Sequence, residues 1–143
     1  MDNDIKNYIN KAVDNDNNKC LLDLSSKKIK ERKLEIINEL DSTKKYKGEL
    51  LKKLNNYRYI DEIPELHIGT HIRWIKLNED NQYYLTNGAI LVDILFEDET
   101  ILLLKNNFNK FFKIYLSHNL IFQKLTNQEI IILYALDNID KIK

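Results

Sequence analysis

The pattern of apolar residues changes at Pro64, and this change constrains the fold more than any other feature of the chain. Before Pro64, Ile and Leu recur among charged residues at helical spacing. After Gly69, short β-branched and aromatic runs are separated by Asn, Gly and acidic turns. Because proline cannot continue a helix and favours an extended residue before it, we expect an α+β chain in which a helical segment precedes a β-rich head.

Residues 25–57 predict one long helix, with Ser25 or Ser26 as its N-cap. A heptad pattern that begins at Ile29 puts mainly apolar residues at position a and Leu40 and Leu54 at position d, which is typical of coiled coils, although Lys33 and Lys47 at d weaken the seam. The alternative to self-association is that this seam packs on the rest of the same chain. Gly48 is unfavourable inside a helix, so two shorter helices are an alternative to one long helix. We expect the chain to form a dimer or trimer through six residues of the seam: Ile29, Ile36, Leu40, Leu50, Leu54 and Tyr57.

Basic residues are concentrated in the same segment. The chain has 22 basic and 22 acidic residues and no formal net charge, but residues 25–58 hold 11 Lys or Arg against 5 Asp or Glu. A basic helix can contact phosphates, although a solvated helix surface is the alternative and interleaved glutamates weaken the case for nucleic acid. The candidate nucleic-acid-binding residues are Lys27, Lys28, Lys30, Arg32, Lys33, Lys44, Lys45 and Lys47.

Residues 1–24 predict a short amphipathic helix over 2–14 and an Asn- and Asp-rich linker, which together form a docking segment or a loosely ordered tail. The acidic start lacks the basic and apolar regions of a signal peptide. No apolar run approaches the roughly 20 residues that span a bilayer. Cys20 is the only cysteine, so no internal disulfide can form. We therefore expect an intracellular protein that is not secreted and does not insert into membranes.

Residues 61–143 predict a β-rich head that ends in a helix. Five strands of about six residues are expected near 71–77, 89–96, 100–105, 111–116 and 120–125, and residues 83–85 are a short strand or a loop. Short polar turns between such strands fit a small closed or half-closed antiparallel barrel. Thr126 and Glu129 form a capping box that predicts a C-terminal helix over 127–139, with a sixth strand through 130–134 as the alternative.

Three segments of the head, Gly69–Trp74, Asn87–Val92 and Phe111–Phe122, make residues 66–126 similar to SH3-like barrels of the Tudor and KOW kind. The Asn-, Ile- and Lys-rich composition of the whole chain resembles that of small uncharacterised proteins of large DNA viruses of protists. The first resemblance implies a five-stranded SH3-like barrel that binds a partner. The second implies a location in the cytoplasm, a viral factory or a virion.

Tudor-like barrels can hold a methylated lysine or arginine in an aromatic cage, so the resemblance implies a partner site among the aromatic residues of the head. The candidate partner-binding residues are Arg73, Trp74, Tyr83 and Tyr84, with Phe96 as a further aromatic. A core position for Trp74 is the alternative. KOW-like barrels bind nucleic acid or polymerase subunits, but residues 59–143 contain 8 basic and 12 acidic residues, which disfavours phosphate contacts.

No motif assembles a catalytic or metal site. His67 and His71 are four residues apart, but Gly69 and the strand that follows break the helical spacing that would bring them together. The three glycines are too far apart for a phosphate-binding loop. We therefore expect no cofactor, no metal and no enzymatic activity. The sequence predicts a structural or adaptor protein with a linker (1–24), a self-associating helix (25–60) and a partner-binding head (61–143), or alternatively a nucleic-acid-associated factor.

Overall fold

The computed structural model describes residues 25–77 and 82–138, and the predicted helix at 2–14 and its linker lie outside these residues. Contacts divide the chain into two compact units. One unit consists of residues 33–124, and the other contains residues 25–32 and 125–138 of the described part. Helix α2 (Ser26–Asn38) passes from the second unit into the first.

The long helix predicted over residues 25–57 is wrong. The segment forms two helices, α2 and α3 (Lys44–Lys53), and Tyr57 begins a strand instead of ending a helix. The interruption lies at residues 39–43 and not at Gly48, which is inside α3. Asp, Ser and Thr compete with a helix for backbone hydrogen bonds, and the hydroxyl of Thr43 accepts the N–H of Tyr46 at 3.2 Å as the N-cap of α3. The segment therefore lacks the continuous helix that the predicted heptad seam requires.

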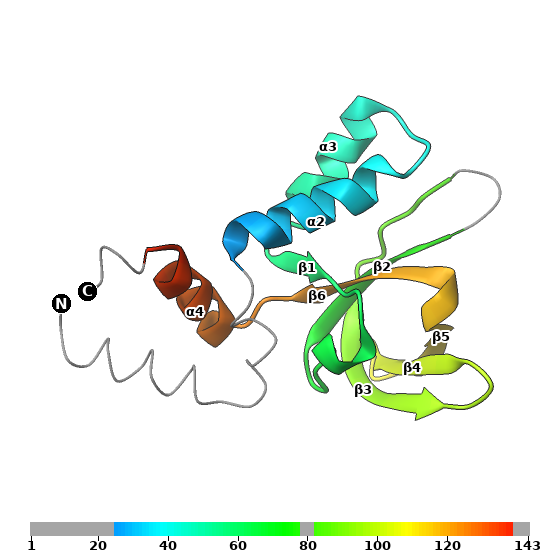
Figure 1. The fold of residues 1–143 in the computed structure, drawn as a ribbon. Helices are drawn as coiled ribbons and strands as arrows, with labels where there is room; N and C mark the ends of the chain where they lie inside the picture. Colours follow the sequence, from blue (N-terminus) through cyan, green and yellow to red (C-terminus); the bar gives the residue numbers. More distant parts are fainter. Residues whose placement is uncertain (1–24, 78–81, 139–143) are drawn as a thin grey trace, which may run out of the picture. The chain divides into compact units, whose positions relative to one another are not determined.

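The predicted five-stranded SH3-like barrel is also wrong. The strands form one open antiparallel sheet of six strands in the order β1-β6-β2-β3-β4-β5, shown in Figure 1. Among the described residues, no pairing joins the outer strands β1 and β5. The missed strand is β1, whose three residues are too few for an alternating pattern to be recognised. The strands are β1 (Tyr57–Tyr59), β2 (His71–Lys76), β3 (Ala89–Phe96), β4 (Thr100–Lys105), β5 (Phe111–Tyr115) and β6 (Asn119–Lys124).

Side chains alternate along the strands, and each face of the sheet covers its own apolar cluster. In β2, Ile72 and Trp74 pack into a cluster with Leu91, Leu102 and other residues of β3, β4 and β6. This cluster holds the strands β2 to β6 together from one side.

The second cluster joins the helices of the 33–124 unit to the opposite face. Ile75 of β2 and Phe122 of β6 meet apolar side chains of the C-terminal half of α2 and of α3, which lie beside each other in Figure 1. The residues that α2, α3 and the turns after them contribute to this cluster are Ile36, Ile37, Leu40, Leu50 and Leu54. The helices are therefore part of the same core as the sheet.

The segment between β1 and β2 contains the short 3-10 helix η2 (Ile63–Glu65), and a buried polar network attaches it to the sheet. The guanidinium of Arg58, which is 2% exposed, pairs with the carboxylate of Glu65 at 3.2 Å. Fully buried Gln123 accepts hydrogen bonds from the backbone of His67 and the hydroxyl of Thr70, and donates to the carbonyl of Glu65. This network therefore fixes the segment between β1 and β2 to strands β1 and β6.

Within the other unit, helix α4 (Asn127–Asp137) confirms the predicted helix and its capping box. The hydroxyl of Thr126 accepts the N–H of Glu129, and the carboxylate of Glu129 accepts the N–H of Thr126. Ile132 and Leu133 pack with Ile29 in a small apolar cluster of this unit. The alternative of a strand over residues 130–134 is wrong, because these residues are helical. The strand that was not predicted is β1.

Candidate functional site

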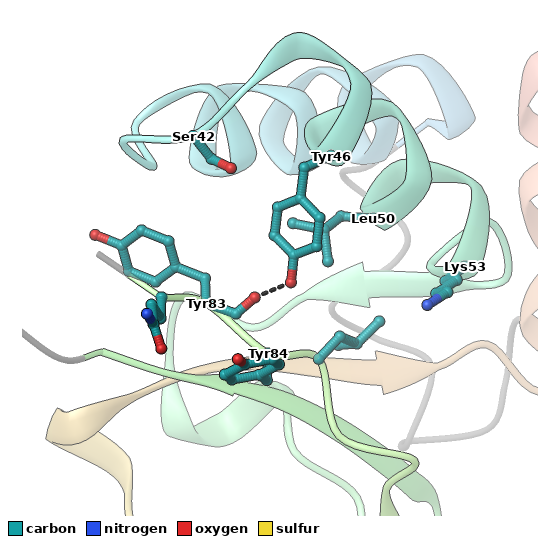
Figure 2. Close-up of a pocket in the computed structure, with 8 residues that line it drawn as sticks. Ser42, Tyr46, Leu50, Lys53, Tyr83 and Tyr84 are labelled. Carbon is teal, nitrogen blue, oxygen red and sulfur yellow. Dashed lines mark hydrogen bonds between the residues drawn. The ribbon is translucent and has the colours of Figure 1, made fainter. Parts of the chain in front are cut away.

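A pocket of about 410 Å³ lies between α3 and residues 82–85 in the 33–124 unit. Three tyrosines surround it, so we call it the tyrosine pocket (Figure 2). Apolar Leu50 and Leu85 and polar side chains complete the lining. The described residues that line it are Ser42, Tyr46, Leu50, Lys53, Gln82, Tyr83, Tyr84 and Leu85.

Helix geometry places three of these side chains in a row. Tyr46, Leu50 and Lys53 are spaced by four and three residues, so they lie on one face of α3. Figure 2 shows Tyr46 reaching from the helix toward the backbone of Tyr83, with Ser42 and Lys53 on either side of it along the chain. Leu50 is buried and anchors the row to the core, so the pocket has a fixed helical wall.

The opposite wall is held by β2. Leu85 forms an antiparallel bridge with Ile75, and the N–H of Thr86 donates to the carbonyl of Trp74 at 3.0 Å. Arg73 ties this wall to the helix, because its guanidinium donates to the carbonyls of Thr86 at 2.8 Å and of Lys53 at 3.3 Å. Arg73 therefore positions both walls of the pocket.

A tyrosine hydroxyl closes the space between the walls. The hydroxyl of Tyr46 donates a hydrogen bond to the backbone carbonyl of Tyr83, marked by the dashed line in Figure 2. Burial raises the pKa of Tyr46, and the nearby Tyr84 and Glu49 raise it further. The phenol is therefore neutral and remains a donor at physiological pH.

The pocket combines aromatic faces with a cation and opens to solvent. The side chain of Tyr84 is 72% exposed, so its ring is accessible from outside. Lys53 follows Lys52 at the end of α3, a helix that carries five lysines and one glutamate. A flat apolar group that bears or neighbours a negative charge would complement this lining.

The structure brings together two of the four predicted partner-binding residues. Tyr83 and Tyr84 line the pocket, and Arg73 supports it. Trp74 is buried in the core, where its ring lies 5.6 Å from that of Phe112. Phe96 is exposed at the end of β3 and does not line the pocket. The sequence missed Tyr46, because nothing in its pattern showed that residues 82–85 fold against α3.

The six residues predicted to mediate self-association are buried in the chain's own clusters. Ile29 packs with Ile132 and Leu133, and the other five belong to the cluster between the helices and the sheet. This arrangement is the intramolecular packing that the sequence left open as the alternative. The six side chains therefore do not present an apolar seam to solvent.

The candidate nucleic-acid-binding residues have different environments. Buried Lys33 donates to two backbone carbonyls, so it does not face phosphates. The ammonium of Lys27 lies 3.9 Å from a carboxylate oxygen of Glu31. The ammonium of Lys47 donates a hydrogen bond to the backbone carbonyl of Asn38. Arg32 is half-buried, whereas Lys28, Lys30, Lys44 and Lys45 are exposed.

Within residues 25–77 and 82–138, no group of three or more His, Cys, Asp or Glu side chains is placed to hold a metal ion. His67 and His71 lie on either side of Gly69, and the Nδ1 atom of His71 is 2.9 Å from the hydroxyl of Tyr57. Among the helices of the described part, none has both the length and the apolar character needed to cross a bilayer.

Comparison of the chain with protein-family models, curated proteins and solved structures found no match. The tyrosine pocket is therefore interpreted from its own geometry and chemistry.

Proposed function

We propose that the protein is a non-enzymatic adaptor and that its tyrosine pocket binds a segment of a partner protein. The eight described residues that line the pocket include no imidazole, carboxylate or thiol, the groups that most often serve as general base or nucleophile. They do include three tyrosines, a residue type enriched at protein interfaces. The observation that carries the proposal is this cluster of tyrosines beside the cation of Lys53.

The chemistry of the lining defines the segment that would bind. An aromatic or long aliphatic side chain would pack on Tyr84 and Leu85, while a neighbouring carboxylate would approach Lys53. Lys52 extends the positive charge along the end of α3. Self-association is not part of this proposal, because the seam predicted for it is buried.

Selection of binding peptides from a display library of random sequences about 12 residues long tests the proposal. We expect the enriched peptides to combine an aromatic residue with Asp or Glu. Tyr84→Ala should weaken their binding by about 30-fold, the effect of a typical interface hot spot, and Lys53→Glu should weaken it through charge repulsion. Tyr84 is mostly exposed, so its replacement should leave the fold intact.

Tyr134→Ala is the matched control, because Tyr134 is an equally prominent exposed tyrosine on α4 and does not line the pocket. This variant should bind the selected peptides as the original protein does. Peptides that bind Tyr84→Ala with unchanged affinity, or a library that yields no enriched sequence, would refute the proposal.

A second candidate function is binding of single-stranded nucleic acid, favoured by the lysines of α3 next to accessible aromatic rings. Residues 33–124 contain 13 basic and 13 acidic residues, so the unit as a whole lacks a positive field, and we rank this function second. Fluorescence anisotropy with a labelled oligothymidine about 12 nucleotides long tests it. Binding that falls steeply with salt, and falls less steeply when Lys44 and Lys45 are changed to Gln, would favour nucleic acid over protein.

A further inference from the structure

The outer strand β5 has a free edge that lacks most of the features by which proteins protect such edges. It contains no proline, and its pairing with β4 runs from Phe111 to Tyr115 without a register shift. The other outer strand, β1, has only three residues, and the carbonyl of Tyr57 already accepts a hydrogen bond from the Lys33 ammonium. Lys113 is the one charged side chain of β5, and an edge without proline or a bulge remains a template for a further strand.

The hydrogen-bonding pattern shows which backbone groups of β5 face the free edge. The N–H of Asn106 donates to the carbonyl of Lys110 at 3.0 Å, and pairs in an antiparallel ladder alternate from there. Phe112 and Ile114 therefore bond to β4, whereas the N–H and C=O groups of Phe111 and Lys113 point outward. The outward carbonyl of Tyr115 agrees with this pattern, because it accepts the side-chain amide of Asn119 at 2.7 Å.

The side chains of β5 define what could pair there. On one face, Phe112 and Ile114 pack against the core but stay partly exposed, so an added strand would cover them with apolar side chains. On the other face, Phe111 is 59% exposed and Lys113 is exposed at the centre of the strand. The ammonium of Lys105 lies 5.8 Å from the ring centre of Phe111, which adds positive charge at the same end of β5.

We propose that the edge of β5 binds an extended segment of a partner protein in which apolar and acidic residues alternate. The apolar residues would extend the core over Phe112 and Ile114, and an acidic residue would lie opposite Lys113. A second copy of β5 fits less well, because antiparallel self-pairing centred on Lys113 sets two ammonium groups opposite each other. None of the described residues that line the tyrosine pocket belongs to β4 or β5, so this site is independent of the proposed function.

Titration of the isotope-labelled protein with a capped peptide of about seven residues, in which valine and glutamate alternate, tests the proposal by NMR. We expect chemical-shift changes at the amides of Phe111–Tyr115 and slower hydrogen exchange at the N–H groups of Phe111 and Lys113. A peptide in which valine and lysine alternate should bind about tenfold more weakly. Lys113→Glu should reverse this preference, because it replaces the central cation by an anion.

Lys76→Glu provides the control, since it changes the net charge equally at an exposed position at the end of β2. It should leave the preference for glutamate unchanged. Absence of shifts in β5, or shifts that Lys76→Glu and Lys113→Glu alter equally, would overturn the proposal. Shifts in β5 that appear when the protein alone is concentrated would also overturn it, because they would make a second copy the occupant.

Discussion

The ammonium of Lys33 in α2 donates a hydrogen bond to the backbone carbonyl of Leu54 at the end of α3, over a distance of 2.7 Å. The same group donates to the carbonyl of Tyr57 at 2.9 Å. A buried lysine of α2 thus satisfies the carbonyl at the end of α3 and a carbonyl at the start of β1, and joins both elements to α2. This position was expected to weaken a seam between chains, but it stabilises packing within one chain.

Replacing Lys33 by Met should lower the free energy of unfolding by about 1–2 kcal/mol, because the side-chain volume is kept while the hydrogen bonds to both carbonyls are lost. Urea unfolding followed by circular dichroism measures this change. Lys30→Met, at an exposed position of the same helix, should change the free energy by less than about 0.5 kcal/mol. A Lys33→Met variant as stable as the original protein would show that these bonds contribute nothing to stability.

The ion pair between buried Arg58 and partly buried Glu65 gives the second prediction. The Glu65 carboxylate also accepts the backbone N–H groups of Asp61 and Glu62. Glu65→Ala removes these bonds and leaves the Arg58 guanidinium buried without its partner, so it should cost about 3 kcal/mol in urea unfolding. The double variant Arg58→Met with Glu65→Ala should be more stable than Glu65→Ala, since it buries no unpaired charge. If adding Arg58→Met lowers the stability further, the explanation by charge burial is wrong.

Local sequence patterns correctly predicted those strands and helix ends whose structure depends mainly on their own residues. The strand ranges at 89–96 and 100–105 match β3 and β4, and the capping box of Thr126 and Glu129 forms as expected. The heptad seam was misinterpreted because intermolecular and intramolecular burial give the same apolar spacing. The continuous helix that the heptads suggested is interrupted at residues 39–43, and the Thr43 hydroxyl caps the start of the second helix.

Contacts between distant segments could not be predicted in the same way. Tyr46 meets residues 82–85 only because α3 packs on the sheet, and the pairing of β1 with β6 joins Tyr57 to Lys124. Nothing in the sequence distinguished Arg58 from the other basic residues, yet it is among the most buried side chains. Such positions depend on tertiary packing, which overrides local preference. Two of the four predicted partner-binding residues reach the pocket, since the sequence identified exposed aromatics but not the helix opposite them.

His71 should make the stability of the fold depend on pH. Burial lowers the pKa of His71 below its ordinary value of 6.5, and the cations of Lys124 and Arg73 lower it further. The unfolded chain therefore binds a proton at a higher pH than the folded chain, so stability should fall as the pH drops below 6.5. Urea unfolding at about pH 7.5, 6.5 and 5.5 measures this slope.

Two variants separate His71 from other titrating groups. His71→Gln should flatten the dependence between neutral and mildly acidic pH, because it removes the titrating imidazole. Tyr57→Phe tests the contact of 2.9 Å between the Tyr57 hydroxyl and Nδ1 of His71. A hydroxyl that donates to the neutral ring would favour that form, so its removal would then flatten the slope in part. An unchanged slope in His71→Gln would assign the dependence to another group.

Gly88 and Gly48 should respond in opposite directions to replacement by alanine. Gly88 has a φ of +90°, and a Cβ atom there would overlap the carbonyl oxygen of Ile72 and the ring of His71. Gly88→Ala should therefore cost about 2 kcal/mol or more, from both backbone strain and overpacking. Gly48 lies inside α3, where a Cβ atom would meet nothing within 4 Å, so Gly48→Ala should add about 1 kcal/mol. Thermal and urea unfolding measure both changes, and a destabilising Gly48→Ala would contradict a continuous α3 through this residue.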